Sequence, residues 1–332
     1  MIEFDNGIHI KGTGLWLDAR RKVNFCFVSH AHADHAIKHA EILATRETAK
    51  LFEHRYGKAK FKTLEYNRPR RFDGVKLELF PSGHILGGAQ ILIEKGGVRI
   101  VYTGDFKLRR SLTATSAEIK KCDILIMEST FGRPHYVFPR PRQVQAQMIE
   151  FVQDARARGE IPVFLAYSLG KAQEAMKILS NRGYKLSVHQ RIYDIAKIYE
   201  EFGVKLRSYK LYRGENLDAD VLIIPPQSRR SRMVESIPRK TTAILTGWAM
   251  DAGTRFYSGT DAAIPLSDHA DFSELIEYVR KVQPKKIYTV HGFAELVKCL
   301  REKGFDAQQL TERTTFYTTL SKEVLMNYDL FA

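Results

Sequence analysis

The densest group of chemically active side chains lies in the segment SHAHADHA, at residues 29–36. It contains His30, His32, Asp34 and His35, separated and flanked only by Ser and Ala. In an extended chain, positions 30, 32 and 34 point to one face, and position 35 joins them where the backbone turns. Imidazoles and a carboxylate this close favour a divalent zinc-like ion, because it neutralises the carboxylate and uses the imidazole lone pairs. A polar loop with chance histidines is the alternative, and the spacing argues against it.

Further polar residues follow apolar runs, at the points where strands are expected to end. They are His84 after VKLELFPSG, Asp105 after VRIVYTG, Glu128 after DILIM and His291 after KKIYTV, while His269 in PLSDHAD opens a helix. Strand ends at one edge of a layered sheet commonly gather functional sites. Taken singly, a histidine such as His84 is more often hydrogen-bonded than metal-bound, and Asp105 could be a turn residue. Jointly these residues supply enough ligands for two metal ions.

The spacing of apolar residues predicts the strands and helices that would position these side chains. Residues 75–80 alternate at period two, and residues 91–102 predict a hairpin around Lys95-Gly96-Gly97. Apolar residues recur at helical spacing over 144–155, 172–179, 192–202, 272–279 and 296–300. The order is strand-rich to about residue 131 and then alternates strands with helices, which predicts an α/β fold with parallel strands. Segments 132–142 and 247–265 are the candidate boundaries between domains.

Composition narrows the class of protein and its partners. The chain has 52 Lys plus Arg against 38 Asp plus Glu, a formal charge of +14. This excess attracts polyanions such as nucleic acid, although the ion-pair networks of a thermophile-type surface are an alternative explanation. Three distant cysteines without a C-x-x-C pair exclude a disulfide scaffold and a cysteine-based zinc site. No apolar run of about 18 residues and no signal sequence are apparent, so we expect a cytoplasmic protein without a membrane partner.

The motifs together resemble a known family. SHAHADH resembles the H-x-H-x-D-H signature of the metallo-β-lactamase superfamily, Asp18 in LWLDA its first acidic motif, and GHILGGAQ and TGD its next two motifs. ESTFG, SLGKAQE, SDHAD and VHG resemble motifs of the β-CASP nucleases, which include the mRNA 3′-end endonuclease, RNase J and Artemis. ESTFGRPHY and FLAYSLGKAQ look most like the compact DNA ligase-associated exonucleases of this branch. The resemblance extends from about residue 12 to 310, although residues 185–240 contribute no motif.

The resemblance implies an αββα metallo-β-lactamase sandwich, formed by residues 1–135 and 262–332, with an inserted α/β β-CASP domain at 136–261. It implies two zinc ions, with manganese as an alternative active metal. His30, His32 and His84 would bind one ion, Asp34, His35 and His291 the second, with Asp105 bridging them and Asp18 orienting the His-rich loop. Glu128 would keep His269 protonated for the leaving oxygen or the scissile phosphate, and Asp34 is counted with this pair as catalytic.

Two metal ions and a general acid suit hydrolysis of a phosphodiester. We expect a nuclease acting on DNA, RNA or both, with a DNA exonuclease slightly favoured. An RNA-processing nuclease of the mRNA 3′-end type is the main alternative, since a histidine such as His291 is typical of RNA-processing relatives. A non-catalytic nucleic-acid-binding subunit and a small-molecule hydrolase are weaker alternatives. A homodimer, and association with a DNA ligase or RNA-processing machinery, stay open.

Two groups of residues are candidates for phosphate binding. Ser168, Gly170 and Lys171 lie where the strand IPVFLAY turns into a helix, so free N–H groups and a cation could face a phosphate. An ordinary helix cap explains the same residues. Arg133 lies near the expected mouth between the domains, with Tyr136 and Phe138 available for stacking. The other arginine clusters, at 68–71, 140–142 and 229–232, could track a backbone, but such runs are more often a solvated face.

Overall fold

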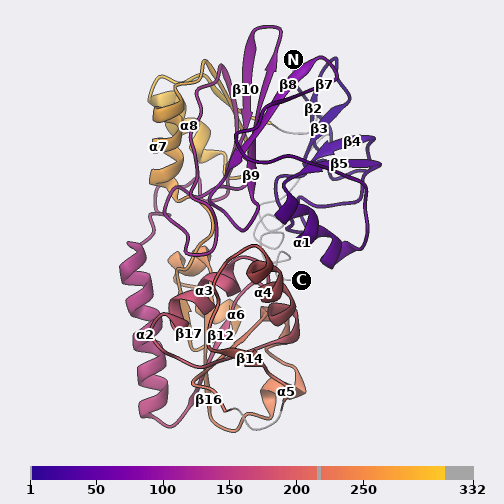
Figure 1. Cartoon of the computed structure of the whole chain (residues 1–332). Coiled ribbons are helices and arrows are strands. Elements are labelled where there is room, and N and C mark those ends of the chain that lie inside the picture. Colours follow the sequence, from indigo (N-terminus) through magenta and orange to yellow (C-terminus); the bar gives the residue numbers. More distant parts are fainter. Residues whose placement is uncertain (1, 215–217, 311–332) are drawn as a thin grey trace.

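The computed structural model describes residues 2–214 and 218–310. In these residues the strands form three sheets, two in the upper half of Figure 1 and one in the lower half. The predicted metallo-β-lactamase segment at 311–332 lies outside the described residues. The first sheet has the order β1 (Ile2–Phe4), β2 (Ile8–Ile10), β3 (Leu15–Leu17), β4 (Phe25–Phe27), β5 (Glu41–Ala44) and β6 (Phe61–Thr63). Strands β3 to β6 are parallel.

The second sheet packs face to face against the first. Its order is β19 (Ala307–Gln309), β18 (Lys286–Gly292), β11 (Ile124–Ser129), β10 (Val98–Tyr102), β9 (Ala89–Lys95), β8 (Val75–Pro81) and β7 (Arg70–Phe72). Strands β9 and β10 form the predicted hairpin, in which Gly96 and Gly97 take positive φ angles of 55° and 78°. Such angles suit glycine because it has no Cβ to clash.

Alternation along the strands explains the layers. Leu79, Ile91 and Ile100 point into the core between the two sheets, together with Leu17 and Phe27 of the first sheet. The residues between them on the strands of the second sheet point the other way, against helices: Phe80, Leu92 and Val101 pack with Leu275, Val279 and Leu300. Because successive strand residues point to opposite faces, one sheet serves two cores.

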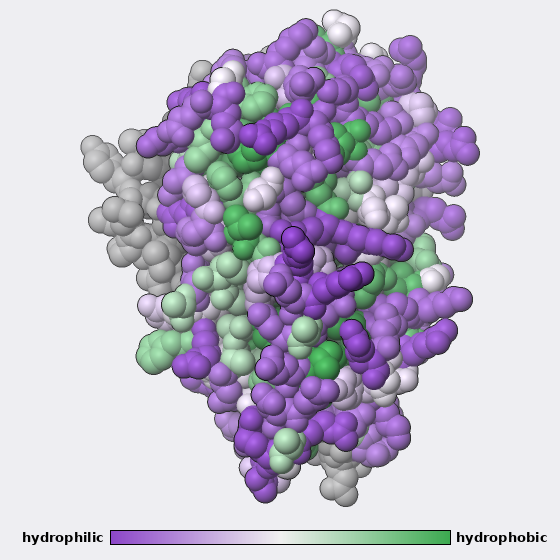
Figure 2. Space-filling view, turned by 90° about the vertical axis from the view of Figure 1, so that its left-hand side faces the viewer, coloured by the Kyte–Doolittle hydropathy of each residue, from purple (hydrophilic) through white to green (hydrophobic). Residues whose placement is uncertain are grey.

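Helices complete the sandwich. Helices α7 (Phe272–Val282) and α8 (Glu295–Glu302) cover the second sheet, and α1 (Arg46–Tyr56) lies beside the first sheet (Figure 1). The face that carries α2, α7 and α8 is mainly hydrophilic, with smaller hydrophobic areas between (Figure 2). The layers are therefore helix, sheet, sheet and helix, which confirms the predicted α/β fold of the metallo-β-lactamase type.

The third sheet is entirely parallel. Its order is β14 (Tyr209–Leu211), β13 (Leu186–Val188), β15 (Val221–Ile224), β12 (Ile161–Leu165), β16 (Lys240–Leu245) and β17 (Ala262–Ile264). The connecting helices and turns are α2 (Pro141–Ala157), α3 (Lys171–Ser180), α4 (Gln190–Glu201), η1 (Pro226–Ser228), α5 (Arg232–Glu235), η2 (Gly247–Met250) and α6 (Thr254–Ser258). The motif-free segment 185–240 thus supplies β13, β14 and β15. The division at 261/262 stays a prediction, and β17 of this sheet begins at Ala262.

Candidate metal centre

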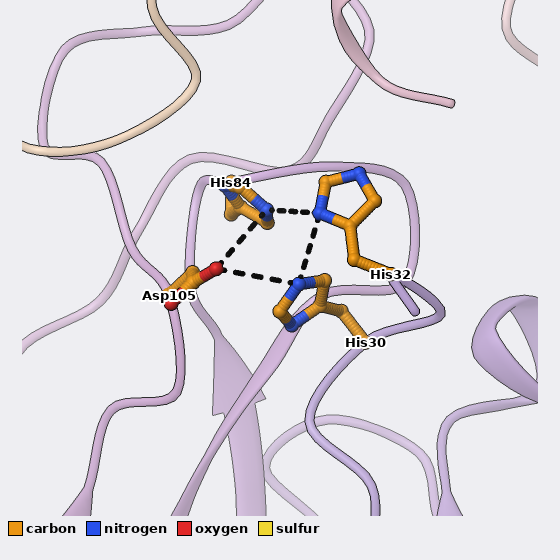
Figure 3. Close-up of side chains that lie close together, drawn as sticks. All are labelled: His30, His32, His84 and Asp105. Carbon is orange, nitrogen blue, oxygen red and sulfur yellow. Dashed lines mark hydrogen bonds and ion pairs between the residues drawn. The ribbon is translucent and has the colours of Figure 1, made fainter. Parts of the chain in front are cut away.

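Four side chains converge at the ends of three strands. His30 and His32 follow β4, His84 follows β8, and Asp105 follows β10. His32 Nδ1 lies 3.0 Å from His30 Nε2 and 3.1 Å from His84 Nε2. Asp105 Oδ2 lies 3.4 Å from His30 Nε2 and 3.8 Å from His84 Nε2, so the four donor atoms enclose one point (Figure 3).

The four donor atoms fit a tetrahedral zinc ion. Ligand nitrogens about 2.0–2.1 Å from zinc lie about 3.3 Å from one another, close to the distances found here. Burial, with neighbouring imidazoles, lowers the pKa of His30 well below its ordinary value and that of His84 to about 3. Burial also lowers the pKa of His32. The three imidazoles are therefore held neutral, which is the form that binds a metal.

A second group of donors shares the Asp105 carboxylate. His35 Nε2 lies 3.5 Å from Asp34 Oδ2 and 3.4 Å from Asp105 Oδ2. Burial opposes the charged form of His35, but Asp105 and neighbouring carboxylates raise its pKa well above its ordinary value. A metal cation that replaces this proton would be stabilised by the same carboxylates. The same Asp105 oxygen lies 3.4 Å from the nearest nitrogens of both His30 and His35, which is the position of a bridging ligand.

His291 lies next to this second group. Its ring centroid is 5.0 Å from that of His35, and its Nδ1 is 3.4 Å from Nη2 of Arg20. In the described chain it belongs to neither group of potential ligand atoms lying within 4.8 Å of one another. Burial, together with His35, lowers the pKa of His291 to about 4. His291 is therefore neutral near the second group, and its role as a ligand stays a prediction.

Asp18 orients the histidine loop from behind. Its Oδ2 accepts hydrogen bonds from Ser29 Oγ at 2.6 Å, Tyr102 Oη at 2.8 Å and His35 Nδ1 at 2.7 Å. Ser29 Oγ in turn lies 2.9 Å from Nδ1 of His30. One buried carboxylate thus reaches a histidine of each donor group. A partner on the outer nitrogen fixes which ring nitrogen faces the metal.

Replacing Asp18 by Asn is expected to weaken zinc binding about 10–100-fold, because His35 Nδ1 and the Ser29 hydroxyl lose their shared anionic acceptor. Competition with a chromogenic chelator measures the affinity. Asp123→Asn, a change of the same kind beside the far end of β11, is the matched control. Equal zinc affinity in both variants would show that Asp18 does not orient the ligands.

The buried Glu128 and the partly exposed His269 form a pair beside Asp105. His269 Nδ1 lies 3.0 Å from Glu128 Oε2, and Glu128 Oε1 accepts a 2.7 Å hydrogen bond from the Phe106 amide. Although burial opposes the charged form, Glu128 and Asp105 raise the pKa of His269 to about 9. The pair is held in place by the N-cap of α7, where the Asp271 and Glu274 side chains accept each other's amide hydrogens. These contacts favour a protonated His269 next to the metal ligands.

The turn before α3 packs against the metal centre and carries the candidate phosphate ligands. The Leu169 carbonyl lies 3.1 Å from Nε2 of His32. The Gly170 amide donates to Gln173, which also donates to the Ser168 carbonyl, so this turn is capped from within. Lys171 is buried and paired with the Asp268 carboxylate. These contacts differ from the expected free N–H groups and cation, and phosphate binding by Ser168, Gly170 and Lys171 stays a prediction.

The Lys171–Asp268 ion pair joins the third sheet's helix α3 to the loop of His269. Asp268 also accepts the Nδ1 hydrogen bond of His84 through its carbonyl, at 2.8 Å. Lys171→Met is expected to lower the free energy of unfolding by about 3–5 kcal/mol, because it leaves the buried Asp268 charge unpaired. Lys171→Met with Asp268→Ala is expected to recover much of this loss.

Urea unfolding measures both free energies. Lys281→Met on α7 is the control, since its partner Glu277 and Lys281 itself are exposed and their pairing contributes little. A Lys171→Met protein as stable as this control would contradict the coupling.

Arg133 lies at the surface over an aromatic cluster. Its guanidinium is 3.8 Å from the ring centroid of Phe293, and its Nε donates to Glu295 at 2.8 Å. Tyr136 and Phe138, predicted to be available for stacking, are 3% and 6% exposed, so that prediction is wrong. They fill a small core because Phe131 packs against both rings. The role of Arg133 in phosphate binding stays a prediction.

Sequence reasoning missed Asp268, Arg20 and the Leu169 carbonyl as partners of the histidines. Asp268 is adjacent to His269 in SDHAD, so its position offered a signal. Leu169 offered none, because any residue carries a carbonyl.

Comparison with known proteins shows which family and which proteins the chain resembles. Residues 262–310 match the family described as "Zn-dependent metallo-hydrolase RNA specificity domain". The chain is 39% identical to a "Probable DNA ligase" of Opitutus terrae, over 94% of this chain and 31% of that protein. It is 24% identical to an "RNase J-like protein" of Methanocaldococcus jannaschii, over 82% of each chain. It is 36% identical to "Endoribonuclease YSH1" of Kluyveromyces lactis, over 70% of this chain and 38% of that protein.

The family match and the His/Asp clusters, which could hold metal ions, are those of a family of zinc-dependent metallo-hydrolases. More narrowly, the chain belongs to the β-CASP family of metallo-β-lactamase-fold nucleases. It spans about a third of the length of the ligase and YSH1 relatives. In residues 2–214 and 218–310, no helix is both long and apolar enough to cross a membrane.

Proposed function

We propose that the chain is a nuclease that uses two zinc ions to hydrolyse phosphodiester bonds of nucleic acid, with a DNA strand shortened from its end as the favoured substrate. The observation that carries the proposal is the single Asp105 oxygen shared by both donor groups, with His269, paired with Glu128, beside it. His30, His32, His84 and Asp105 would hold one ion, and Asp34, His35, His291 and Asp105 the other. Zinc supplies Lewis-acid activation of water and stabilisation of phosphate charge.

The chain's own residues would handle the proton. With Nδ1 of His269 bound by Glu128, Nε2 is the nitrogen left to donate a proton to the leaving oxygen. Such a proton matters because an alkoxide is a poor leaving group. Asp18 and the Leu169 carbonyl keep the ligand imidazoles in position. Asp34 would act beside His35, at the more exposed side of the centre.

DNA is favoured because the relative named as a DNA ligase covers nearly all of this chain, at 39% identity. The alternative is an RNA-processing nuclease, supported by the match to an RNA specificity domain and by the relatives named as RNases. A non-catalytic role would require that metal-binding positions be missing, and the four-donor cluster is complete. Manganese would suit the same imidazole and carboxylate donors as an alternative active metal.

Digestion of 5′- and 3′-labelled DNA and RNA strands by the purified protein, loaded with zinc or manganese, tests the proposal. We expect stepwise shortening of DNA, and RNA cut at internal positions would favour the alternative. A thioester substrate tests for a small-molecule hydrolase, and His32→Ala is the inactive control. If the wild type cuts neither nucleic acid with either metal, the proposed function is wrong.

A further inference from the structure

An open groove of about 470 Å³ lies on the metal domain, outside the metal centre. Its lining consists of Arg46, Thr63, Leu64, Glu65, Arg68 and Arg70. The three arginines are exposed, and in the described residues their side chains have no hydrogen bond or ion pair to another side chain. Some surface cations elsewhere have such partners, as Lys60 and Lys62 do with Glu41. Within the described lining Glu65 is the one carboxylate, so the groove has a surplus of positive charge.

The groove opens on the same edge of the sandwich as the metal centre. Strands β4, β5 and β6 are parallel neighbours, in the register Phe27 with Leu43 and Ala44 with Thr63. The carboxyl end of β4 leads to His30, that of β5 to Arg46, and that of β6 to the groove wall. Because adjacent strands lie about 4.7–4.9 Å apart, the groove begins about 10 Å from the His-rich loop.

Two residues next to the groove lining, Thr45 and Tyr66, pack on the loop that carries His84. Thr45, the N-cap of α1, donates to the Gly87 carbonyl at 2.8 Å, and Tyr66 Oη donates to the Gly88 carbonyl at 3.0 Å. Gly87 has a φ of 74°, and a Cβ there would lie 2.7 Å from the amide of Thr48. Glycine is therefore required for this close approach. The loop from His84 to Gly88 therefore packs on residues that flank the groove lining.

The segment that carries Arg68 is fixed in place. The Asn67 amide donates to the Leu79 carbonyl at 2.8 Å, and its side chain donates to Glu118 at 3.0 Å. Lys120 donates to the Asn67 side-chain oxygen at 2.8 Å. After Arg68, Arg70 pairs with Leu77 of β8. Because the backbone is held before and after Arg68, binding through its guanidinium costs little backbone entropy. The groove is thus preformed around flexible cationic side chains.

We propose that Arg46, Arg68 and Arg70 bind backbone phosphates of the nucleic-acid strand whose scissile bond lies at the metal centre. This inference rests on the proposed function and specifies where the substrate runs: across the carboxyl ends of β4, β5 and β6. Guanidinium groups match phosphate oxygens in paired hydrogen bonds, and three of them along one groove suit successive phosphates. Contacts of this kind fix the position of a strand without reading its bases.

The test compares two double variants that each lose two positive charges. Arg68→Gln with Arg70→Gln removes cations from the groove. Arg182→Gln with Arg207→Gln is the matched control. These exposed residues precede β13 and β14, the two outermost strands at one edge of the third sheet, and do not line the groove. Binding of a labelled phosphorothioate 20-mer to the zinc-loaded full chain is measured by fluorescence anisotropy between 0.05 and 0.3 M salt, roughly the range over which counterion release is steep. Turnover of bis(p-nitrophenyl) phosphate reports on the metal centre alone.

The groove variant is expected to bind about 25-fold more weakly at 0.1 M salt, with a log–log salt slope smaller by about 1.4. These values follow from two lost phosphate contacts, each contributing about 0.7 to the slope for a single strand. The control is expected to bind like the wild type, and all proteins should turn over the small diester equally. An equal loss of binding affinity in both double variants, or no loss in either, overturns the proposal that the groove binds the strand. A wild type that cleaves neither nucleic acid nor the small diester overturns the proposed function instead.

Discussion

Asp105→Ala is expected to abolish turnover and to strip zinc from both halves of the centre. Its Oδ2 lies 3.4 Å from the donor nitrogens of His30 and His35, so one substitution removes a ligand from each donor group. Burial opposes ionisation of Asp105, but His35 and His269 hold its pKa well below the usual range, so it is a carboxylate at neutral pH. The loss of zinc affinity should exceed the roughly 10–100-fold that a supporting residue contributes. Elemental analysis after dialysis measures the metal, and nucleic-acid digestion measures turnover.

The control for Asp105→Ala is Asp306→Ala, an exposed aspartate paired with Lys286 at the other edge of the sheet. It should keep the zinc content and turnover of the wild type. Asp105→Asn adds a sharper comparison, because it keeps the shape and removes the charge. If Asp105→Ala retained both ions, the bridging position of its carboxylate would be refuted. If it lost one ion only, Asp105 would serve a single metal.

His269→Ala is expected to keep the zinc and to lose about 10²–10⁴-fold in kcat, the range typical of a missing general acid. Its Nδ1 lies 3.0 Å from Glu128 Oε2 and 3.9 Å from Asp105 Oδ2, and His269 is not one of the four donors His30, His32, His84 and Asp105. Zinc content, melting temperature and kcat are measured on the same preparation. Measuring zinc content and kcat together separates loss of proton donation from loss of metal. The Asp105 variant, in contrast, is expected to lose both zinc and turnover.

The exposed His54 on α1 offers the matched control, since His54→Ala removes an imidazole away from the metal ligands. Glu128→Gln should lower kcat as well. The kcat of Glu128→Gln with His269→Ala should be little lower than that of His269→Ala alone, because the two residues act as a unit. Near-normal turnover of His269→Ala would exclude it as the proton donor. A simultaneous loss of zinc would reassign it as a metal ligand.

Local patterns predicted the elements well. The alternation over 75–80 became β8, the glycine pair at 96–97 became the hairpin turn, and the helical spacing over 272–279 became α7. These features are readable because an apolar stripe records which side of a strand or helix faces a core. Helix α1 and the short strands β5 to β7 were not predicted from these patterns. The few residues of each of these strands carry little periodicity.

Partners from distant segments were harder to predict. Lys171, a candidate phosphate ligand in a turn that could equally be an ordinary helix cap, pairs with Asp268. Tyr136 and Phe138, predicted to be available for stacking, are buried. A cation next to a helix start looks the same in sequence whether it faces solvent or a carboxylate from another layer. Only the packing of α3 against the loop of His269 distinguishes them.

The sequence by itself determined the kind of chemistry. The residue types and spacing of His30, His32, Asp34 and His35, with a net charge of +14, already indicated a metal centre serving a polyanion. The tertiary structure decided which donor atoms lie together, that one Asp105 oxygen lies beside both donor groups, and that an arginine-lined groove lies next to the helix start that packs on Gly87. The reason is that ligand identity is a local property of the chain. Distances between donors depend instead on how strands far apart in sequence end at one edge of two packed sheets.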